Sequence, residues 1–117
     1  MKINDPLVAT IVEGLQDCKA QDIRVVDMSK MEEAAVMYFV TCEGTSSTHV
    51  AGIAGGLTDY VRSRSGQHSL GTIGLANRQW VAIDYGHVLV HIFQPETRQF
   101  YRLEELWSDA PQVEIEN

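Results

Sequence analysis

The sequence predicts an α/β fold: a single layered domain with a central mixed β-sheet flanked by helices. Segments with apolar residues at helical spacing alternate with short runs that are rich in β-branched and aromatic residues. Two of these runs, residues 80–84 and 88–93, are separated by only residues 85–87, which is typical of a β-hairpin. The chain has 117 residues, enough for one domain with a sizeable core, and contains no repeat or internal linker.

The first elements are a helix and two strands. Asp5-Pro6 predicts a helix start, because Asp caps helices and Pro suits their first position, and the apolar spacing carries this helix over residues 6–20. Residues 23–28 predict a short strand, and the connector at 29–35 has room for one helical turn. Residues 36–42 form the most apolar strand, which belongs near the centre of the sheet.

A Gly-Thr-Ser-Ser run at residues 44–47 ends that strand and supplies hydroxyl groups to cap the next helix, over residues 48–64. Three glycines in this helix, Gly52, Gly55 and Gly56, are poor helix formers and indicate close packing of its backbone against the sheet. Ser65-Gly66 is expected to end the helix.

The hydrophobic pattern is weaker between the second helix and the hairpin. Residues 68–73 predict a third, weakly patterned strand, and 74–79 a loop. Two short helical segments are expected at 95–101 and 103–107. We take residues 1–110 as the domain, and 111–117 as an acidic, frayed tail.

The hairpin divides its side chains into two faces, because successive residues of a strand point to opposite sides. With Gly86-His87 as the turn, Ala82 pairs with His91 and Trp80 with Phe93. The aliphatic face is predicted to be core and carries Val81, Ile83, Tyr85, Val88, Val90 and Ile92. The mixed face is interpreted as a working surface, with cover by another helix as the alternative; it carries Trp80, Ala82, Asp84, Leu89, His91 and Phe93.

Composition limits the classes of partner and compartment. The formal net charge of −7 argues against nonspecific binding of nucleic acid and favours a basic protein partner. Cys18 and Cys42 lie in apolar contexts and predict buried free thiols rather than a disulfide or zinc site. No apolar run approaches the ~20 residues that span a bilayer, and no signal peptide is evident, so a cytoplasmic protein without membrane contact is expected.

The residues offer little catalytic chemistry. A two-metal phosphoryl-transfer site needs converging carboxylates, and the predicted strands carry only Asp27 and Asp84, far apart. The hydroxyl-rich run at 44–47 could hold a phosphate, although helix capping is the commoner role. The four histidines, His49, His68, His87 and His91, are too scattered to predict a metal site. The residues therefore predict a non-enzymatic binding domain without cofactor or metal, with a nucleotide-binding or nucleotidyltransferase-like enzyme as the alternative.

Residues 7–110 resemble the ribosomal silencing factor (Iojap-like) family. The motifs that carry the resemblance are Tyr38-Phe39-Val40, Gly44-Thr45-Ser46-Ser47 with His49-Val50, Trp80-Val81, Asp84-Tyr85-Gly86, Val90-His91-Ile92-Phe93-Gln94-Pro95-Glu96, Arg98 with Phe100-Tyr101, and Leu103-Glu104 with Leu106-Trp107. Any one of these motifs alone is weak, and together they are highly specific.

The resemblance implies a fold related to nucleotidyltransferases but without their catalytic carboxylates, and a homodimer. It also implies binding to the large ribosomal subunit through the basic ribosomal protein L-fourteen, which sterically blocks joining of the small subunit and represses translation when nutrients are short. For this chain we expect partner contacts from Trp80, Ala82, Asp84, Tyr85, His91 and Phe93. A surplus of aromatic residues near the C-terminus predicts dimer contacts from Phe100, Tyr101 and Trp107, with packing of Trp107 back onto the hairpin as the alternative.

The chain departs from the family pattern at five positions, and most of these departures remove a charge near the loops at the end of the sheet. Met37 stands where aspartate is usual, which further weakens a catalytic interpretation. The other four departures are Glu43, Thr48, Ile73 and His87.

Overall fold

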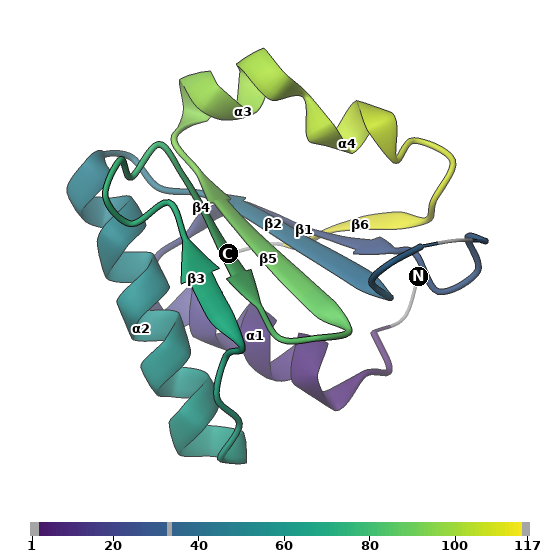
Figure 1. The fold of residues 1–117 in the computed structure, drawn as a ribbon, viewed down its shortest axis with the longest axis horizontal. Helices are drawn as coiled ribbons and strands as arrows, with labels where there is room; N and C mark the ends of the chain where they lie inside the picture. Colours follow the sequence, from purple (N-terminus) through teal and green to yellow (C-terminus); the bar gives the residue numbers. More distant parts are fainter. Residues whose placement is uncertain (1–2, 33, 116–117) are drawn as a thin grey trace.

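The computed structural model describes residues 3–32 and 34–115, which form one mixed sheet with helices on both sides (Figure 1). The strand order is β3-β4-β5-β2-β1-β6; β2 and β5 are parallel and the other neighbours are antiparallel. The predicted α/β class and the central place of β2 are confirmed. The elements are α1 (Pro6–Asp17), β1 (Gln21–Asp27), β2 (Tyr38–Glu43), α2 (Ser47–Ser65), β3 (Gly71–Ile73), β4 (Trp80–Asp84), β5 (Val88–Phe93), α3 (Pro95–Tyr101), α4 (Leu103–Leu106) and β6 (Gln112–Ile115).

The predicted helix caps are present. Asp5 Oδ1 accepts hydrogen bonds from the first-turn amides of α1, at 2.9 Å from Leu7 N and 3.1 Å from Val8 N. Ser46 caps α2, because its Oγ accepts from His49 N at 3.1 Å, and Gly66 ends α2 with a φ of 72°. The prediction that the first helix reaches residue 20 is wrong, since Lys19 adopts a φ of 62° and turns the chain into β1 after Asp17.

The core lies between the sheet and helices α1 and α2 (Figure 1). The hairpin face that was predicted as core is wholly buried there, and Tyr85, at 3% exposure, belongs to it. The cross-strand pairs of the hairpin match the predicted register, with Trp80 opposite Phe93 and Ala82 opposite His91. Gly86 makes the turn possible with a φ of 88°, a backbone conformation that glycine adopts at no steric cost.

The expectation that three glycines of α2 pack against the sheet is wrong. Gly52 and Gly55 have no atoms near the place of a Cβ, and they lie on the exposed side of the helix. Gly56 is close to the Cys18 side chain, so it allows α2 to approach the end of α1 rather than the sheet. Both cysteines are free as predicted; Cys42 is buried and Cys18 is partly buried.

The chain after Pro111 is not a frayed tail as far as it is described. Residues Gln112–Ile115 form β6, which pairs with β1 at the edge of the sheet, while residues 116–117 lie outside the described residues. Val113 and Ile115 pack against the core, and Glu114 forms an ion pair with Arg24 at 3.2 Å.

Two further predictions need correction. The described part of the 29–35 connector contains turns and bends but no helical turn. The third strand is shorter than expected and spans only Gly71–Ile73. Within the described ranges, no helix is both long and apolar enough to cross a membrane.

Candidate functional site

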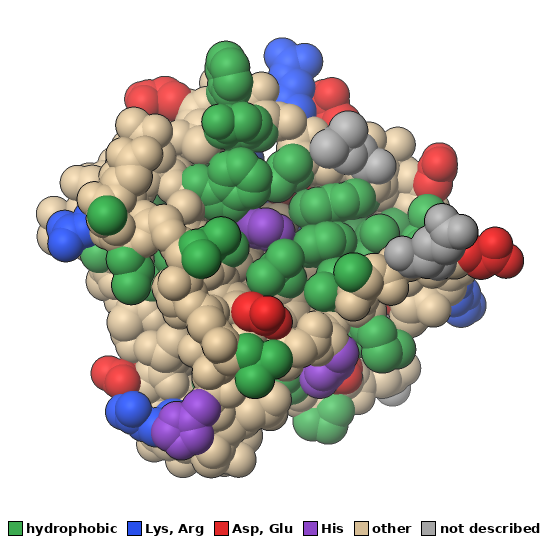
Figure 2. Space-filling model, in the orientation of Figure 1, with side chains coloured by type: hydrophobic (Ala, Val, Ile, Leu, Met, Phe, Trp, Pro, Cys, Tyr) green, Lys and Arg blue, Asp and Glu red, His purple; other side chains and the backbone are tan. Residues whose placement is uncertain are grey.

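The side of the sheet opposite α1 and α2 is only partly covered, by the segment with α3 and α4 (Figure 1), and side chains from neighbouring strands line up on it in rows. Because β2, β4 and β5 are paired in register, Thr41, His91 and Ala82 lie side by side across the sheet. Trp80 and Phe93 form the next row towards α3. Apolar side chains spread over the centre of this side of the molecule, and charged side chains lie mostly at its border (Figure 2). We call this side the open face.

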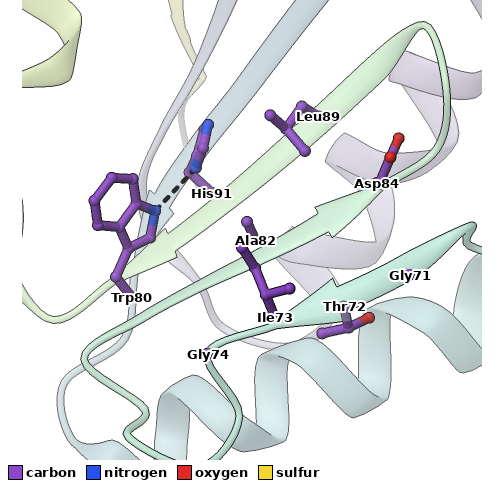
Figure 3. Close-up of a pocket in the computed structure, with 9 residues that line it drawn as sticks. All are labelled: Gly71, Thr72, Ile73, Gly74, Trp80, Ala82, Asp84, Leu89 and His91. Carbon is purple, nitrogen blue, oxygen red and sulfur yellow. Dashed lines mark hydrogen bonds between the residues drawn. The ribbon is translucent and has the colours of Figure 1, made fainter.

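A recess of about 510 Å³ lies in the open face, over strands β3, β4 and β5. Trp80 stands at one end of it and the carboxylate of Asp84 at the other, with Ala82 between them (Figure 3). Its full lining is Gly71, Thr72, Ile73, Gly74, Trp80, Ala82, Asp84, Leu89 and His91. A mostly apolar recess with one exposed carboxylate can accept an aliphatic or aromatic group that also carries a positive charge.

Trp80 is held at its end of the recess by a hydrogen bond and by ring contacts. Its indole Nε1 donates to Nδ1 of His91 at 2.9 Å. Its ring lies 5.2 Å from the ring of Phe93 and 5.0 Å from the ring of Tyr101, measured between centroids. The side chain is half-buried, so it presents part of its surface to solvent in a restrained orientation.

His91 is a buried imidazole at the centre of the aromatic side chains. It is 6% exposed, and burial lowers its pKa to about 4, so the ring is neutral at pH 7. The ring of His91 lies 5.6 Å from Phe39 and 6.0 Å from Trp107 between centroids. Nε2 of His91 is buried without a hydrogen-bond partner among the described residues.

The aromatic residues after β5 divide into a packed and an exposed group. Trp107 stacks on Phe39 of β2 with a centroid distance of 3.9 Å and an interplanar angle of 9°. Its contact with the hairpin, which was the expected alternative to a dimer contact, is with the ring of His91 at 6.0 Å. Phe100 and Tyr101 are 79% and 50% exposed. Of the predicted dimer residues, these two offer the larger free apolar area.

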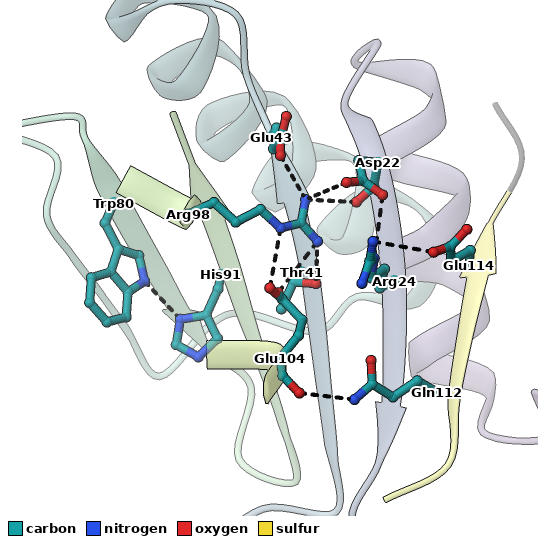
Figure 4. A network of polar contacts seen from close by, with 10 residues as sticks. All are labelled: Asp22, Arg24, Thr41, Glu43, Trp80, His91, Arg98, Glu104, Gln112 and Glu114. Carbon is teal, nitrogen blue, oxygen red and sulfur yellow. Dashed lines mark hydrogen bonds and ion pairs between the residues drawn. The ribbon is translucent and has the colours of Figure 1, made fainter. Parts of the chain in front are cut away.

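A buried arginine joins α3 to the sheet (Figure 4). Arg98 donates to the backbone oxygen of Asp22 at 2.9 Å and to Oγ1 of Thr41 at 3.0 Å. It also donates to Oε1 of Glu43 at 3.3 Å and to Oε1 of Glu104 at 3.4 Å. Reasoning from composition and spacing missed this residue, because nothing in the local pattern distinguishes it from an exposed helical arginine.

The residues predicted to contact a partner divide into a group that lines the recess and a group that is buried. Trp80, Ala82, Asp84 and His91 all line the recess. Phe93 is fully buried beneath Trp80, and Tyr85 points to the side that α1 and α2 cover. Neither side chain is accessible in this conformation, so both are withdrawn as direct contacts.

Two amides of the hydroxyl-rich loop before α2 have partners within the chain. Thr45 N donates to Nδ1 of His49 at 2.9 Å, and Gly44 N donates to the backbone oxygen of Phe93 at 2.8 Å. The other ring nitrogen of His49 lies 3.2 Å from the backbone oxygen of Cys18. Together with the bond from His49 N to Ser46 Oγ, these contacts show the loop in the helix-capping role that was expected to be the commoner one.

The other reactive groups do not converge. Within residues 3–32 and 34–115, no group of three or more His, Cys, Asp or Glu side chains could hold a metal ion. His87 Nε2 lies 2.9 Å from Oδ2 of Asp5 and ties the hairpin turn to the start of α1. Burial raises the pKa of the Cys42 thiol, which disfavours the thiolate that a nucleophile needs.

The five departures from the family pattern lie in different places. Met37 and His87 adjoin at one end of the sheet, where Met37 N donates to the backbone oxygen of His87 at 2.8 Å. Glu43 contacts Arg98 at the opposite end, and Thr48 is exposed in the first turn of α2. Ile73 is exposed and lines the recess, so it is the departure that most directly alters the open face.

The fold and the open face define an α/β domain whose candidate site is an apolar, aromatic recess with a single exposed carboxylate at one end. Residues 2–117 match the model of the family described as ribosomal silencing factor during starvation. The chain therefore belongs to the ribosomal silencing factor family.

Relatives and solved structures agree with this assignment. The chain is 35% identical to the ribosomal silencing factor RsfS of Halalkalibacterium halodurans, over 97% of this chain and 95% of that protein. It is also 35% identical to RsfS of Bacillus subtilis, over 86% and 83% of the two chains. A crystal structure of a Chromobacterium violaceum protein superposes with a TM-score of 0.82 at 29% identity, over 92% of this chain and 88% of that one.

Proposed function

We propose that this protein binds the large ribosomal subunit in the cytoplasm, blocks its association with the small subunit, and so represses translation during nutrient limitation. Membership of the ribosomal silencing factor family supports a regulatory, non-enzymatic role at the ribosome. The open face indicates which residues make the contact. Helices α1 and α2 cover the other side of the sheet, whereas Trp80 and the recess on the open face are accessible.

The partner on the large subunit is a basic protein, ribosomal protein L-fourteen, rather than ribosomal RNA. A chain with a net charge of −7 is repelled by RNA phosphates and attracted to a basic surface. The exposed carboxylate of Asp84 is suited to pair with a Lys or Arg side chain whose aliphatic stem lies over Ala82 and Leu89.

Trp80 is the expected anchor of the contact. Protein interfaces concentrate binding energy in a few Trp, Tyr and Arg side chains near their centre. His91 and Tyr101 already restrain Trp80, so the side chain would lose little further conformational entropy on docking.

The test is the change Trp80→Ala, measured by co-sedimentation and titration with purified large subunits. Loss of an anchor of about 2 kcal/mol should weaken binding by roughly 30-fold. Because Trp80 is only half-buried, the fall in the free energy of unfolding should stay below the about 3–5 kcal/mol of a fully buried Trp.

Tyr60→Ala is the matched control, since Tyr60 is a partly buried aromatic residue of α2, away from the open face. It should leave subunit binding unchanged. A folded Trp80→Ala protein that binds large subunits as tightly as the wild type would contradict the anchor assignment. Failure of the wild-type protein to slow the joining of isolated subunits, followed by light scattering, would contradict the proposed function itself.

A further inference from the structure

We propose that His91 is the positioning residue of the open face: its Nδ1 accepts the indole N–H of Trp80 and holds that ring in the orientation that meets the partner. The inference rests on the proposed function for the partner and on the geometry of the free chain for the positioning. It assigns His91 a role through Trp80 rather than a contact of its own, because His91 is 6% exposed.

The hydrogen bond fixes both the direction of the indole and the tautomer of the imidazole. An indole N–H can only donate, so Nδ1 of His91 must be the acceptor at 2.9 Å and the proton of the neutral ring resides on Nε2. Trp80 and His91 are diagonal neighbours on the antiparallel strands β4 and β5, and their rings meet at 51° (Figure 3). The bond therefore restrains the rotation of the indole about its side-chain torsions.

The acceptor is itself immobilised by surrounding rings. His91 is stacked against Phe93 at 5.9 Å, against Phe39 at 5.6 Å and against Trp107 at 6.0 Å between centroids. A side chain that is enclosed on several sides cannot turn to follow a moving indole. Trp80 is therefore aligned to His91 rather than the reverse.

A restrained anchor binds more tightly than a mobile one, because less side-chain freedom is lost on docking. If His91 loses its acceptor atom, the indole N–H must seek water or remain unpaired at a half-buried site. A neutral hydrogen bond corresponds to a change of about 3- to 10-fold in affinity at 1.4 kcal/mol per decade. We expect a loss of that size for large-subunit binding.

Two substitutions of His91 test separately the hydrogen-bond acceptor and the stacked ring. His91→Phe keeps a planar ring for stacking and removes the acceptor, while His91→Asn keeps an oxygen near the place of Nδ1 and removes the ring. Affinity for purified large subunits should fall about 3- to 10-fold in His91→Phe and recover towards the wild type in His91→Asn. In a Trp80→Phe background, which lacks the indole donor, His91→Phe should cause no further loss.

A readout on the free chain does not depend on the ribosome. The sequence contains two tryptophans, so ¹H–¹⁵N spectra contain two indole signals. The backbone amides of α1, on the other side of the sheet, serve as the internal reference, because the ring of Trp107 also lies against His91. His91→Phe should move the Trp80 signal towards the position of a solvated indole and speed its exchange with water. His91→Asn should restore the wild-type position and exchange rate.

The outcomes distinguish this inference from the proposed function. An unmoved Trp80 signal in a folded His91→Phe protein, or additive losses in the double variant, would overturn the positioning role. A stronger loss in His91→Asn than in His91→Phe would overturn it as well, since stacking would then be what matters. Absence of wild-type binding together with the expected spectral changes would reject the ribosomal partner and retain the alignment of Trp80 by His91.

Discussion

At the scale of single residues, buried polar groups organise the open face. Among the described residues, the buried polar or charged side chains are those of Thr41, His91 and Arg98, and each has a hydrogen-bond partner on another part of the chain. Thr41 receives a hydrogen bond from Arg98, and His91 receives one from Trp80. Leaving a buried polar atom unpaired costs free energy, so these contacts constrain the positions of the side chains that make them.

The depressed pKa of His91 makes stability depend on pH. Burial, partly offset by Glu104, lowers this pKa from 6.5 to about 4 in the folded chain. The unfolded chain therefore binds a proton first as pH falls, and the stability contributed by neutral His91 is lost between pH 6.5 and about 4. At pH 4.5 the wild-type protein should have lost about 2 kcal/mol through this group relative to pH 7.

Urea unfolding at the two pH values measures this loss, and His91→Phe is the comparator because it cannot titrate. Other groups contribute to both proteins equally, so the difference between the two pH dependences reports His91. Equal pH dependences in wild type and variant would refute the assignment.

At the scale of elements, one arginine attaches the segment after β5 to the sheet. Arg98 comes from α3 and contacts β2 through Thr41 and α4 through Glu104. This segment carries Tyr101 and Trp107 to the border of the open face. The position of the aromatic side chains therefore depends on a polar contact as well as on packing.

Arg98→Met should lower the free energy of unfolding by about 3 kcal/mol, because it leaves Thr41 and the carboxylate of Glu104 without their buried partner. The matched control is Arg102→Met, since Arg102 is exposed and its contact with Glu105 is 4.0 Å long. That control should change stability by no more than about 0.5 kcal/mol. Chemical denaturation gives both values, and equal effects of the two substitutions would contradict the attachment.

The final strand is a second element whose contribution can be measured. Removal of residues 111–117 should lower the free energy of unfolding by about 3 kcal/mol, since Val113 and Ile115 lose partial burial and β1 loses its outer neighbour. Removal of residues 116–117 alone is the control and should have little effect. Unchanged thermal unfolding after the longer deletion would show that β6 does not stabilise the sheet.

At the scale of the whole molecule, the exposed aromatic residues beside the open face are suited to a contact between two copies. Phe100 is exposed and Tyr101 packs against Trp80, so a two-fold contact here would border the open face. We therefore predict that the homodimer implied by the family resemblance forms through Phe100 and Tyr101, whereas Trp107 stacks within its own chain.

Light scattering at micromolar concentration should give about twice the chain mass of 13.1 kDa. Phe100→Asp should shift the protein towards the monomer, because a charge would enter an apolar contact. Leu70→Asp is the control, since Leu70 is also highly exposed but lies before β3, away from α3. A wild-type mass near 13.1 kDa would rule out the dimer at this concentration.

Local patterns in the chain were sufficient for the class of fold, the helix caps and the hairpin. Asp5, Ser46 and Gly66 act within one turn of their own positions, so neighbouring residues suffice to assign them. The pairing of β4 with β5 follows from a short turn and from alternation, which are also local properties. The residues of the recess on these two strands, Trp80, Ala82, Asp84, Leu89 and His91, could accordingly be predicted to share a face.

The burial of that face depended on contacts between distant segments. His91 and Phe93 are covered because α3, α4 and Trp107 fold back over β2 and β5, and no local pattern specifies that path. The contacts of Arg98 and the pairing of β6 with β1 join residues that are far apart in the chain. Alternation assigns a side chain to one face of a strand, but only the three-dimensional packing of the other elements establishes whether solvent reaches it.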